Sequence, residues 1–123
     1  MSSPERVVIV GASDRPDRYA HKALLALRRH GHETVLVHPR LKEIEGIPVH
    51  ASLANVTGPV DTVTMYVGPA ASADMAAGLI ALKPKRVIFN PGAENAELQS
   101  ELAGAGILPQ EACTLVLLAT GQF

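Results

Sequence analysis

The sequence predicts an α/β protein with a doubly wound, mostly parallel sheet of five strands and helices on both faces. Two observations support this fold class. Short β-branched apolar runs alternate with helical segments along the chain. Each run is apolar almost throughout, as is typical of parallel strands that are covered on both faces. Because crossovers between parallel strands are right-handed, this alternation favours a sheet with a helical layer on each side.

The first predicted strand covers residues 6–10 and stops at Gly11, where a tight turn is expected. The second strand covers residues 34–38 and ends at Pro39. A helix must connect the two strands if they are parallel. This strand, glycine turn and helix are the phosphate-binding half of a mononucleotide-binding fold.

The connecting helix is predicted over residues 17–30. Asp14 or Asp17 can cap its start, and Gly31 can end it in a left-handed conformation. Apolar residues recur on one face at helical spacing, and these are Ala20, Ala23, Leu24 and Leu27. We expect this face to pack on the sheet.

The second half of the chain repeats the alternation after a looser stretch. That stretch contains a brief extended piece over residues 47–50 and a helical turn over residues 52–55. Further elements are predicted as a strand over 62–67, a helix over 70–82, a strand over 86–90, a helix over 95–105 and a strand over 107–109. The pattern leaves open the structure of the apolar segment 113–119.

Length and composition indicate a single domain over residues 1–123, with 47% hydrophobic and 19% charged residues. The start of the chain lacks the features of a signal peptide, and no apolar run approaches a membrane span. Cys113 is the one cysteine, so an internal disulfide is excluded. We expect a soluble, cytoplasmic protein, and a net charge of −1 gives no support to nucleic-acid binding.

Positive charge gathers near the first turn. Seven of the eleven Lys and Arg residues lie between Arg15 and Lys42, with only Asp17 and Glu33 as acidic residues there. Arg15 and Arg18 are therefore candidates for binding ligand phosphates. A solvated helix face is the alternative explanation for some of this charge.

The ligand site is predicted at the carboxyl ends of the strands, where open α/β sheets bind their ligands. Four turns lie there, and their residues are Gly11, Ala12, Ser13, His38, Pro39, Arg40, Val67, Gly68, Pro69, Asn90, Pro91, Gly92 and Glu94.

The residues narrow the ligand to two classes. The dinucleotide pattern Gly-x-Gly-x-x-Gly is replaced here by Gly11, Ser13 and Pro16. The acidic residue that binds a ribose 2′-hydroxyl in nicotinamide enzymes is also missing, since the second strand ends in His38-Pro39-Arg40. A basic residue there suits a ribose with an extra phosphate. NADP and coenzyme A both fit this Rossmann-like nucleotide site.

Five motifs in order resemble the CoA-binding domain family. They are Val-Ile-Val-Gly-Ala-Ser, Val-His-Pro-Arg, Gly-Ile-Pro-Val-His-Ala-Ser-Leu, Val-Asp-Thr-Val and Asn-Pro-Gly-Ala-Glu-Asn, within residues 6–113. This family comprises small stand-alone proteins similar to the CoA-binding domain of the succinyl-CoA synthetase α subunit. The resemblance favours coenzyme A over NADP.

The resemblance also implies roles for the turn residues. Gly11, Ala12 and Ser13 match the family's phosphate loop, and Arg40 matches a basic residue near the adenosine phosphates. Residues 67–69 match a Val-Pro-Pro turn in which Gly68 replaces the first proline. Residues 90–94 match a Pro-Gly-x-Glu turn near the pantetheine arm.

The predicted function is the binding of coenzyme A or an acyl-CoA without catalysis by this chain. The synthetase depends on a phosphorylated histidine in a further domain, which would begin where this chain ends. Two alternatives remain: a small NADP-binding oxidoreductase, and a subunit of an acyl-CoA ligase or transferase that needs a partner chain. The protein is expected to be a monomer or a homodimer, because the alanine-rich helix over 70–82 can pack on another helix.

Several reactive residue types have plain structural explanations. His30 and His32 are expected to point into solvent, and His38 to shape a turn or the adenine pocket. No metal site is expected, because no histidine pair has helical metal-ligand spacing. Cys113 is expected to be buried, the alternative being a mixed disulfide with the thiol of coenzyme A. Glu94 is expected to cap the next helix rather than act as a general base.

Overall fold

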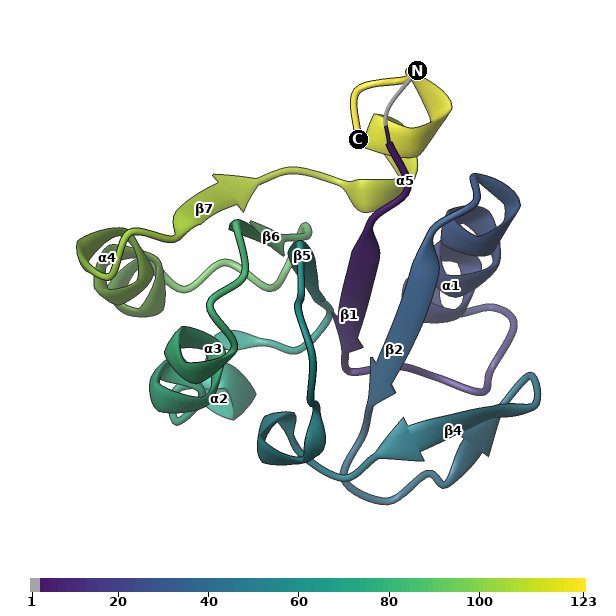
Figure 1. The fold of residues 1–123 in the computed structure, drawn as a ribbon, viewed down its shortest axis with the longest axis horizontal. Coiled ribbons are helices and arrows are strands. Elements are labelled where there is room, and N and C mark those ends of the chain that lie inside the picture. The colour runs from purple at the N-terminus through teal and green to yellow at the C-terminus, as the bar shows by residue number, and fades with distance from the viewer. Residues whose placement is uncertain (1–2) are drawn as a thin grey trace.

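The computed structural model describes residues 3–123, which form one seven-stranded sheet with helices on both faces (Figure 1). The strand order is β3-β4-β2-β1-β5-β6-β7. The strands are β1 (Arg6–Val10), β2 (Glu33–Val37), β3 (Glu43–Ile44), β4 (Ile47–His50), β5 (Thr62–Met65), β6 (Arg86–Phe89) and β7 (Leu108–Glu111). Every pairing is parallel except that of β3 with β4. The doubly wound, mostly parallel fold is confirmed.

The predicted count of five strands is wrong by two. The extended piece at 47–50 is β4, which joins the sheet by pairing Leu36 with Val49 and Val37 with His50. The two-residue strand β3 then turns back on β4 as an antiparallel hairpin. Strands this short carry too few residues for a period of two to be read from the sequence.

The helices divide between the two faces of the sheet (Figure 1). They are α1 (Tyr19–Arg29), α2 (Pro69–Ser72), α3 (Ala76–Leu82), α4 (Ala96–Gly104) and α5 (Thr114–Ala119), with a 3-10 turn η1 (Leu53–Asn55). Side chains of α1 and α5 pack with Val7, Ile9 and Leu36. Side chains of η1, α3 and α4 pack on the opposite face with Val8 and Val63.

Helix α1 buries the face that the spacing predicts: Ala20, Ala23, Leu24 and Leu27 are at most 5% exposed. Gly31 follows the helix with φ of +84°, which confirms the left-handed C-terminal turn. The predicted N-terminal cap is wrong. The helix begins at Tyr19, and the capping position is Arg18, whose side chain makes no capping hydrogen bond. A turn closed by the Arg18 N–H on the Arg15 carbonyl lies where the first helical turn was expected.

The predicted helix over 70–82 is divided into α2 and α3. Ser72 lies at the break and is fully buried. Its hydroxyl donates to the Pro69 carbonyl and its oxygen accepts from the Asn95 amide. Such local side-chain bonds compete with a continuous helix. The segment whose type was open, 113–119, contains α5.

A network of polar and aromatic side chains joins the two ends of the described chain. It lies at the amino-terminal ends of the parallel strands. The Thr62 hydroxyl donates to the Glu5 carboxylate at 2.6 Å and accepts from Arg86 Nε at 2.9 Å. The Phe123 ring lies 4.5 Å from the Arg86 guanidinium and 5.0 Å from the His32 ring. The expectation that His32 points into solvent is wrong, because its Nδ1 accepts from the Glu5 N–H and it is 6% exposed.

Between residues 3 and 123, no helix is both long enough and apolar enough to cross a membrane.

Candidate functional site

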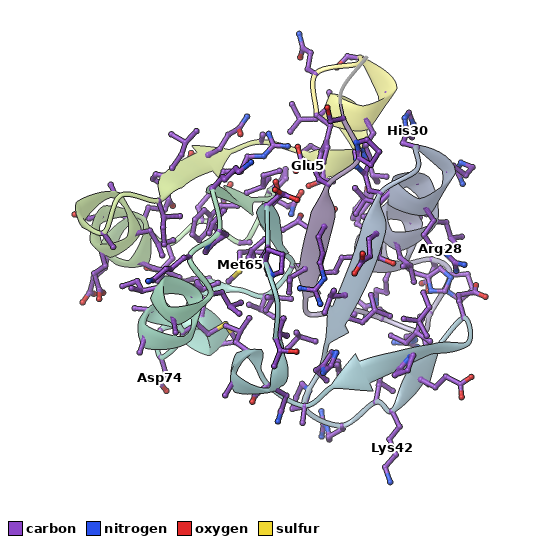
Figure 2. The ribbon with its side chains drawn as sticks, viewed as in Figure 1. Glu5, Arg28, His30, Lys42, Met65 and Asp74 are labelled. Atoms are coloured by element: carbon purple, nitrogen blue, oxygen red, sulfur yellow. The ribbon has the colours of Figure 1, made fainter. Side chains whose placement is uncertain are left out.

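A cleft of about 1040 Å³ opens at the carboxyl ends of β1, β2, β5 and β6. Strand β2 lies on one side of β1 and strand β5 lies on the other. The direction in which the strands are added therefore reverses at β1, and the cleft lies at this point. This is where doubly wound sheets bind ligands. In Figure 2, Asp74 and Lys42 lie at the end of the molecule toward which β1 and β2 point, and Glu5 lies at the opposite end.

The structure brings all but three of the predicted site residues together in this cleft. Those that line it are Gly11, Ala12, Ser13, Arg15, Arg18, His38, Pro39, Arg40, Val67, Gly68, Pro91 and Gly92. They belong to four separate turns, and parallel pairing in register places the turns at one edge of the sheet.

Three predicted site residues lie outside the cleft lining and have other contacts. Asn90 is 2% exposed and connects β5, β6 and α5. Pro69 is the first residue of α2. The Glu94 carboxylate accepts from the Gly92 N–H at 2.9 Å, and Asn95 caps α4 by accepting from the Leu98 N–H. The expectation that Glu94 caps this helix is therefore wrong.

The apolar wall of the cleft was missed by sequence analysis. It includes Leu53, the first residue of η1, Met75, which precedes α3, and Gly78 within α3. A Cβ at Gly78 would lie 3.2 Å from the Leu53 Cβ, so the glycine permits this close approach. No local pattern indicates this contact, because it depends on how two distant segments pack.

The turn after β1 is fixed by close packing on the turn after β5 and by hydrogen bonds to the end of β2. Gly11 has φ of +85°, and a Cβ there would lie 2.7 Å from Val67 Cγ1. The N–H groups of Gly11 and Ala12 both donate to the Val37 carbonyl, at 3.1 and 3.2 Å. These two amides are therefore unavailable to a phosphate. Glycine is required here for the backbone conformation and the close packing.

The next residues offer hydrogen-bond donors. Within residues 3–123, the N–H groups of Ser13 and Asp14 have no protein acceptor. The Ser13 hydroxyl oxygen accepts from the Arg15 N–H at 3.1 Å, which leaves the hydroxyl proton free to donate. At the start of α1, the N–H groups of Tyr19 and Ala20 likewise have no acceptor in the described chain. An uncapped helix N-terminus attracts anions.

Three arginines line the same cleft as these donors. Arg15, Arg18 and Arg40 line the cleft and are exposed. None of them forms an ion pair with a carboxylate of residues 3–123. Asp14 and Asp74 also line the cleft. Because the three arginines outnumber these two carboxylates, the charge in the cleft is positive overall. The arrangement fits a ligand with more than one phosphate.

His38 shapes the turn that carries Arg40. Its Nδ1 accepts from the N–H groups of Arg40 and Leu41, both at 3.0 Å. The ring therefore fixes the backbone after β2, in agreement with the structural explanation of this histidine. No group of three His, Cys, Asp or Glu side chains in residues 3–123 could hold a metal ion.

Cys113 and Tyr66 carry two further reactive groups, and of these two residues only Tyr66 lines the cleft. Cys113 is half-buried and is absent from the cleft lining, so the structure gives no support to disulfide capture of a thiol in the cleft. The Tyr66 hydroxyl is buried without a hydrogen-bond partner among the described residues. Burial raises the pKa of Tyr66 to about 12, so this residue stays protonated at neutral pH.

The family described as CoA binding domain matches residues 5–119. The chain belongs to the CoA binding domain family.

Two solved structures share this fold over nearly the whole chain. The solved structure of an uncharacterized protein is 40% identical, with a TM-score of 0.93 and coverage of 99% of this chain and 100% of that one. Cell-free ID.343 from Thermus thermophilus is 29% identical, with a TM-score of 0.89 and coverage of 98% and 91%. The uncharacterized protein YneT of Bacillus subtilis (strain 168) is 37% identical over 62 residues, which are 50% of this chain and 46% of YneT. That match spans about half the length of YneT.

One departure from the CoA binding domain family pattern has little structural effect. Gly68 stands where the resemblance implies a proline, and its φ of −72° and ψ of 172° are angles that proline itself adopts. The turn therefore keeps a proline-like backbone, and Pro69 still begins α2.

Proposed function

We propose that this protein binds coenzyme A or an acyl-CoA in the cleft and catalyses no reaction by itself. One observation carries the proposal: in a member of the CoA binding domain family, three arginines that pair with no carboxylate of residues 3–123 line the same cleft as the uncapped start of α1. A ligand with several phosphates would neutralise this charge and satisfy the unused N–H groups.

Each part of the ligand has a suitable partner. The diphosphate suits the donors of Ser13 and Asp14 and the start of α1, with Arg15 and Arg18 beside them. Arg40, after β2, suits the 3′-phosphate of the ribose. The apolar wall suits the pantetheine arm. Non-catalytic binding is favoured because the Glu94 carboxylate accepts from Gly92 and lies outside the cleft lining.

The test is calorimetry at fixed salt with coenzyme A, dephospho-coenzyme A, NADP and NAD. Coenzyme A should bind more tightly than its dephospho form. Arg40→Ala should weaken coenzyme A binding by roughly tenfold, the value of one charge-assisted hydrogen bond, and dephospho-coenzyme A binding much less.

The matched control is Lys42→Ala. Lys42 is a neighbouring exposed cation that does not line the cleft, so its loss should leave the affinity nearly unchanged. Tighter binding of NADP than of coenzyme A would overturn the proposal in favour of a small oxidoreductase. Binding of none of the four compounds would also overturn it, and would indicate a site completed by a partner chain.

A further inference from the structure

His21, the third residue of α1, connects two segments that are distant in sequence. The side chain is 4% exposed, although histidine is a polar residue. Its Nδ1 lies 2.8 Å from the Ser13 carbonyl oxygen, and its Nε2 lies 3.1 Å from Glu45 Oε1. A carbonyl oxygen can only accept, so Nδ1 donates to Ser13. The ring thus joins the turn after β1 to the tip of the β3–β4 hairpin.

The contact with Glu45 explains an unusual backbone conformation. Glu45 and Gly46 occupy the two central positions of the β3–β4 turn, with φ of +53° and +76°. Such turns favour Asn, Asp or Gly at the first position, because other residues are strained there. The Glu45 side chain reaches the otherwise buried imidazole. Strain that is kept for a specific contact is typical of functional sites.

The bond to Ser13 determines where a neighbouring donor points. In a trans peptide, the carbonyl of one residue and the N–H of the next point in opposite directions. Because the Ser13 carbonyl is directed at His21, the Asp14 N–H is directed away from His21. Asp14 lines the cleft, and its N–H has no acceptor among residues 3–123.

We propose that His21 is a positioning residue for the anion site. Anchored by Glu45, it holds the Ser13–Asp14 peptide so that the Asp14 N–H donates to a ligand phosphate. The hairpin thereby supports the affinity of a cleft that neither His21 nor Glu45 lines. This inference rests on the proposed binding of a phosphorylated ligand, and it adds the orienting role of a residue outside the cleft.

Two substitutions separate the two bonds of the ring. The amide nitrogen of Asn lies as many bonds from Cα as Nδ1 of His, and that of Gln as many as Nε2. His21→Asn therefore keeps a donor for the Ser13 carbonyl, and His21→Gln keeps a donor for Glu45. In calorimetry with coenzyme A and with inorganic pyrophosphate, His21→Asn should stay within about threefold of the unaltered protein. His21→Gln should weaken both ligands by roughly tenfold, as for the loss of one oriented charge-assisted hydrogen bond.

A measurement without ligand tests the orientation itself. Backbone ¹⁵N relaxation should give Asp14 a rigid order parameter of about 0.85 in the unaltered protein and in His21→Asn, and a lower value in His21→Gln. Glu45→Ala should weaken coenzyme A binding by a few-fold. The matched control is Glu43→Ala, because Glu43 lies on the same hairpin, is exposed and forms no ion pair in the described chain.

The outcomes separate this inference from the proposed function. If the unaltered protein binds coenzyme A but His21→Asn and His21→Gln have equal affinity and equal Asp14 order, the positioning role is wrong and the proposed function stands. If both variants lose affinity together with thermal stability, His21 is structural only, and the inference is again overturned. If the unaltered protein binds neither coenzyme A nor pyrophosphate, both the proposed function and the inference fail.

Discussion

Gly11 shows how one residue can determine both the conformation and the packing of a turn. Its positive φ suits glycine, and its missing Cβ leaves room for the Val67 side chain and the Tyr66 carbonyl. Through this contact, the turn after β1 packs directly on the turn after β5. The absence of a Cβ at Gly11 therefore allows these two turns to lie in contact at the base of the cleft.

Gly11→Ala should lower the free energy of unfolding by more than the about 1–2 kcal/mol that a left-handed conformation costs a non-glycine residue. The added Cβ would lie 2.7 Å from Val67 Cγ1 and 3.0 Å from the Tyr66 oxygen. Gly31→Ala is the matched control, because Gly31 has nearly the same φ but no atom within 4 Å of its Cβ position. Urea denaturation of both variants gives the comparison. Equal losses would show that the close packing at Gly11 contributes nothing.

Protonation of His32 makes the stability of the fold depend on pH. Burial lowers the pKa of His32 below its usual 6.5, although the nearby Glu5 charge opposes this and His30 and Arg86 support it. The unfolded chain therefore takes up a proton at a higher pH than the folded protein does. Stability from this residue is complete above pH 6.5 and is lost as the pH falls from there toward the folded-state pKa.

His32→Asn should reduce this acid sensitivity, because the amide oxygen can still accept from the Glu5 N–H but does not titrate. The check is the melting temperature of both proteins between pH 7.5 and pH 5. The difference between the two curves isolates His32 from the other histidines. Parallel curves would contradict the assigned pKa shift.

At the scale of elements, Asn90 ties three of them together. Its amide nitrogen donates to Thr64 Oγ1 and to the Met65 carbonyl, at 2.7 and 2.8 Å. Its amide oxygen accepts from the Thr114 N–H at 2.9 Å. The end of β6 is thereby joined to β5 and to the start of α5. The motif that contains Asn90 was predicted as a ligand turn, but this side chain holds the elements behind the turn.

Asn90→Ala should destabilise the protein by roughly 3 kcal/mol, because buried backbone groups on two other elements lose their partners. Asn55→Ala serves as control, since Asn55 is exposed and its side chain only accepts from the Ser52 hydroxyl. Thermal unfolding gives the two values. Weakened coenzyme A binding with unchanged stability would instead assign Asn90 to the ligand.

The long apolar strands and the helix faces were predictable because their patterns are local. β1 has the predicted bounds, and Ala23 and Leu27 of α1 are buried as expected. The two-residue strand β3 and the division between α2 and α3 were not predictable. Strand β3 depends on a hairpin pairing of only two residues, which is too short to show a period. The division of the helix depends on the Ser72 bond to Asn95, which lies far away in the sequence.

The candidate site could likewise be predicted from the sequence only in part. Turns at strand ends were predictable, because parallel strands bring their carboxyl ends to one edge of the sheet. The wall formed by Leu53 and Met75, and the support given by His21, arise from packing between distant segments. Sequence patterns carry no information on such contacts.

For the whole molecule, the uneven distribution of charge predicts how binding responds to salt. Positive charge faces the cleft through Arg15, Arg18 and Arg40, whereas the chain after Lys42 is acidic overall. Raising the ionic strength from about 0.1 to about 1 M shortens the screening length from about 10 to about 3 Å. The affinity for coenzyme A should therefore fall several-fold, as calorimetry at both salt concentrations would show. The decrease should be smaller in a variant with Arg15→Ala and Arg18→Ala, and an equal decrease would remove these arginines from the binding face.

The network of Glu5, Thr62, Arg86, His32 and Phe123 lies at the opposite end of the strands from the cleft. Exposed turn residues such as Arg40 and Gly68 take no part in it. We expect substitutions at these exposed positions to change the free energy of unfolding little, as is usual for surface residues away from buried contacts. If coenzyme A binds as proposed, its contacts with the exposed turns could therefore be altered with little loss of stability.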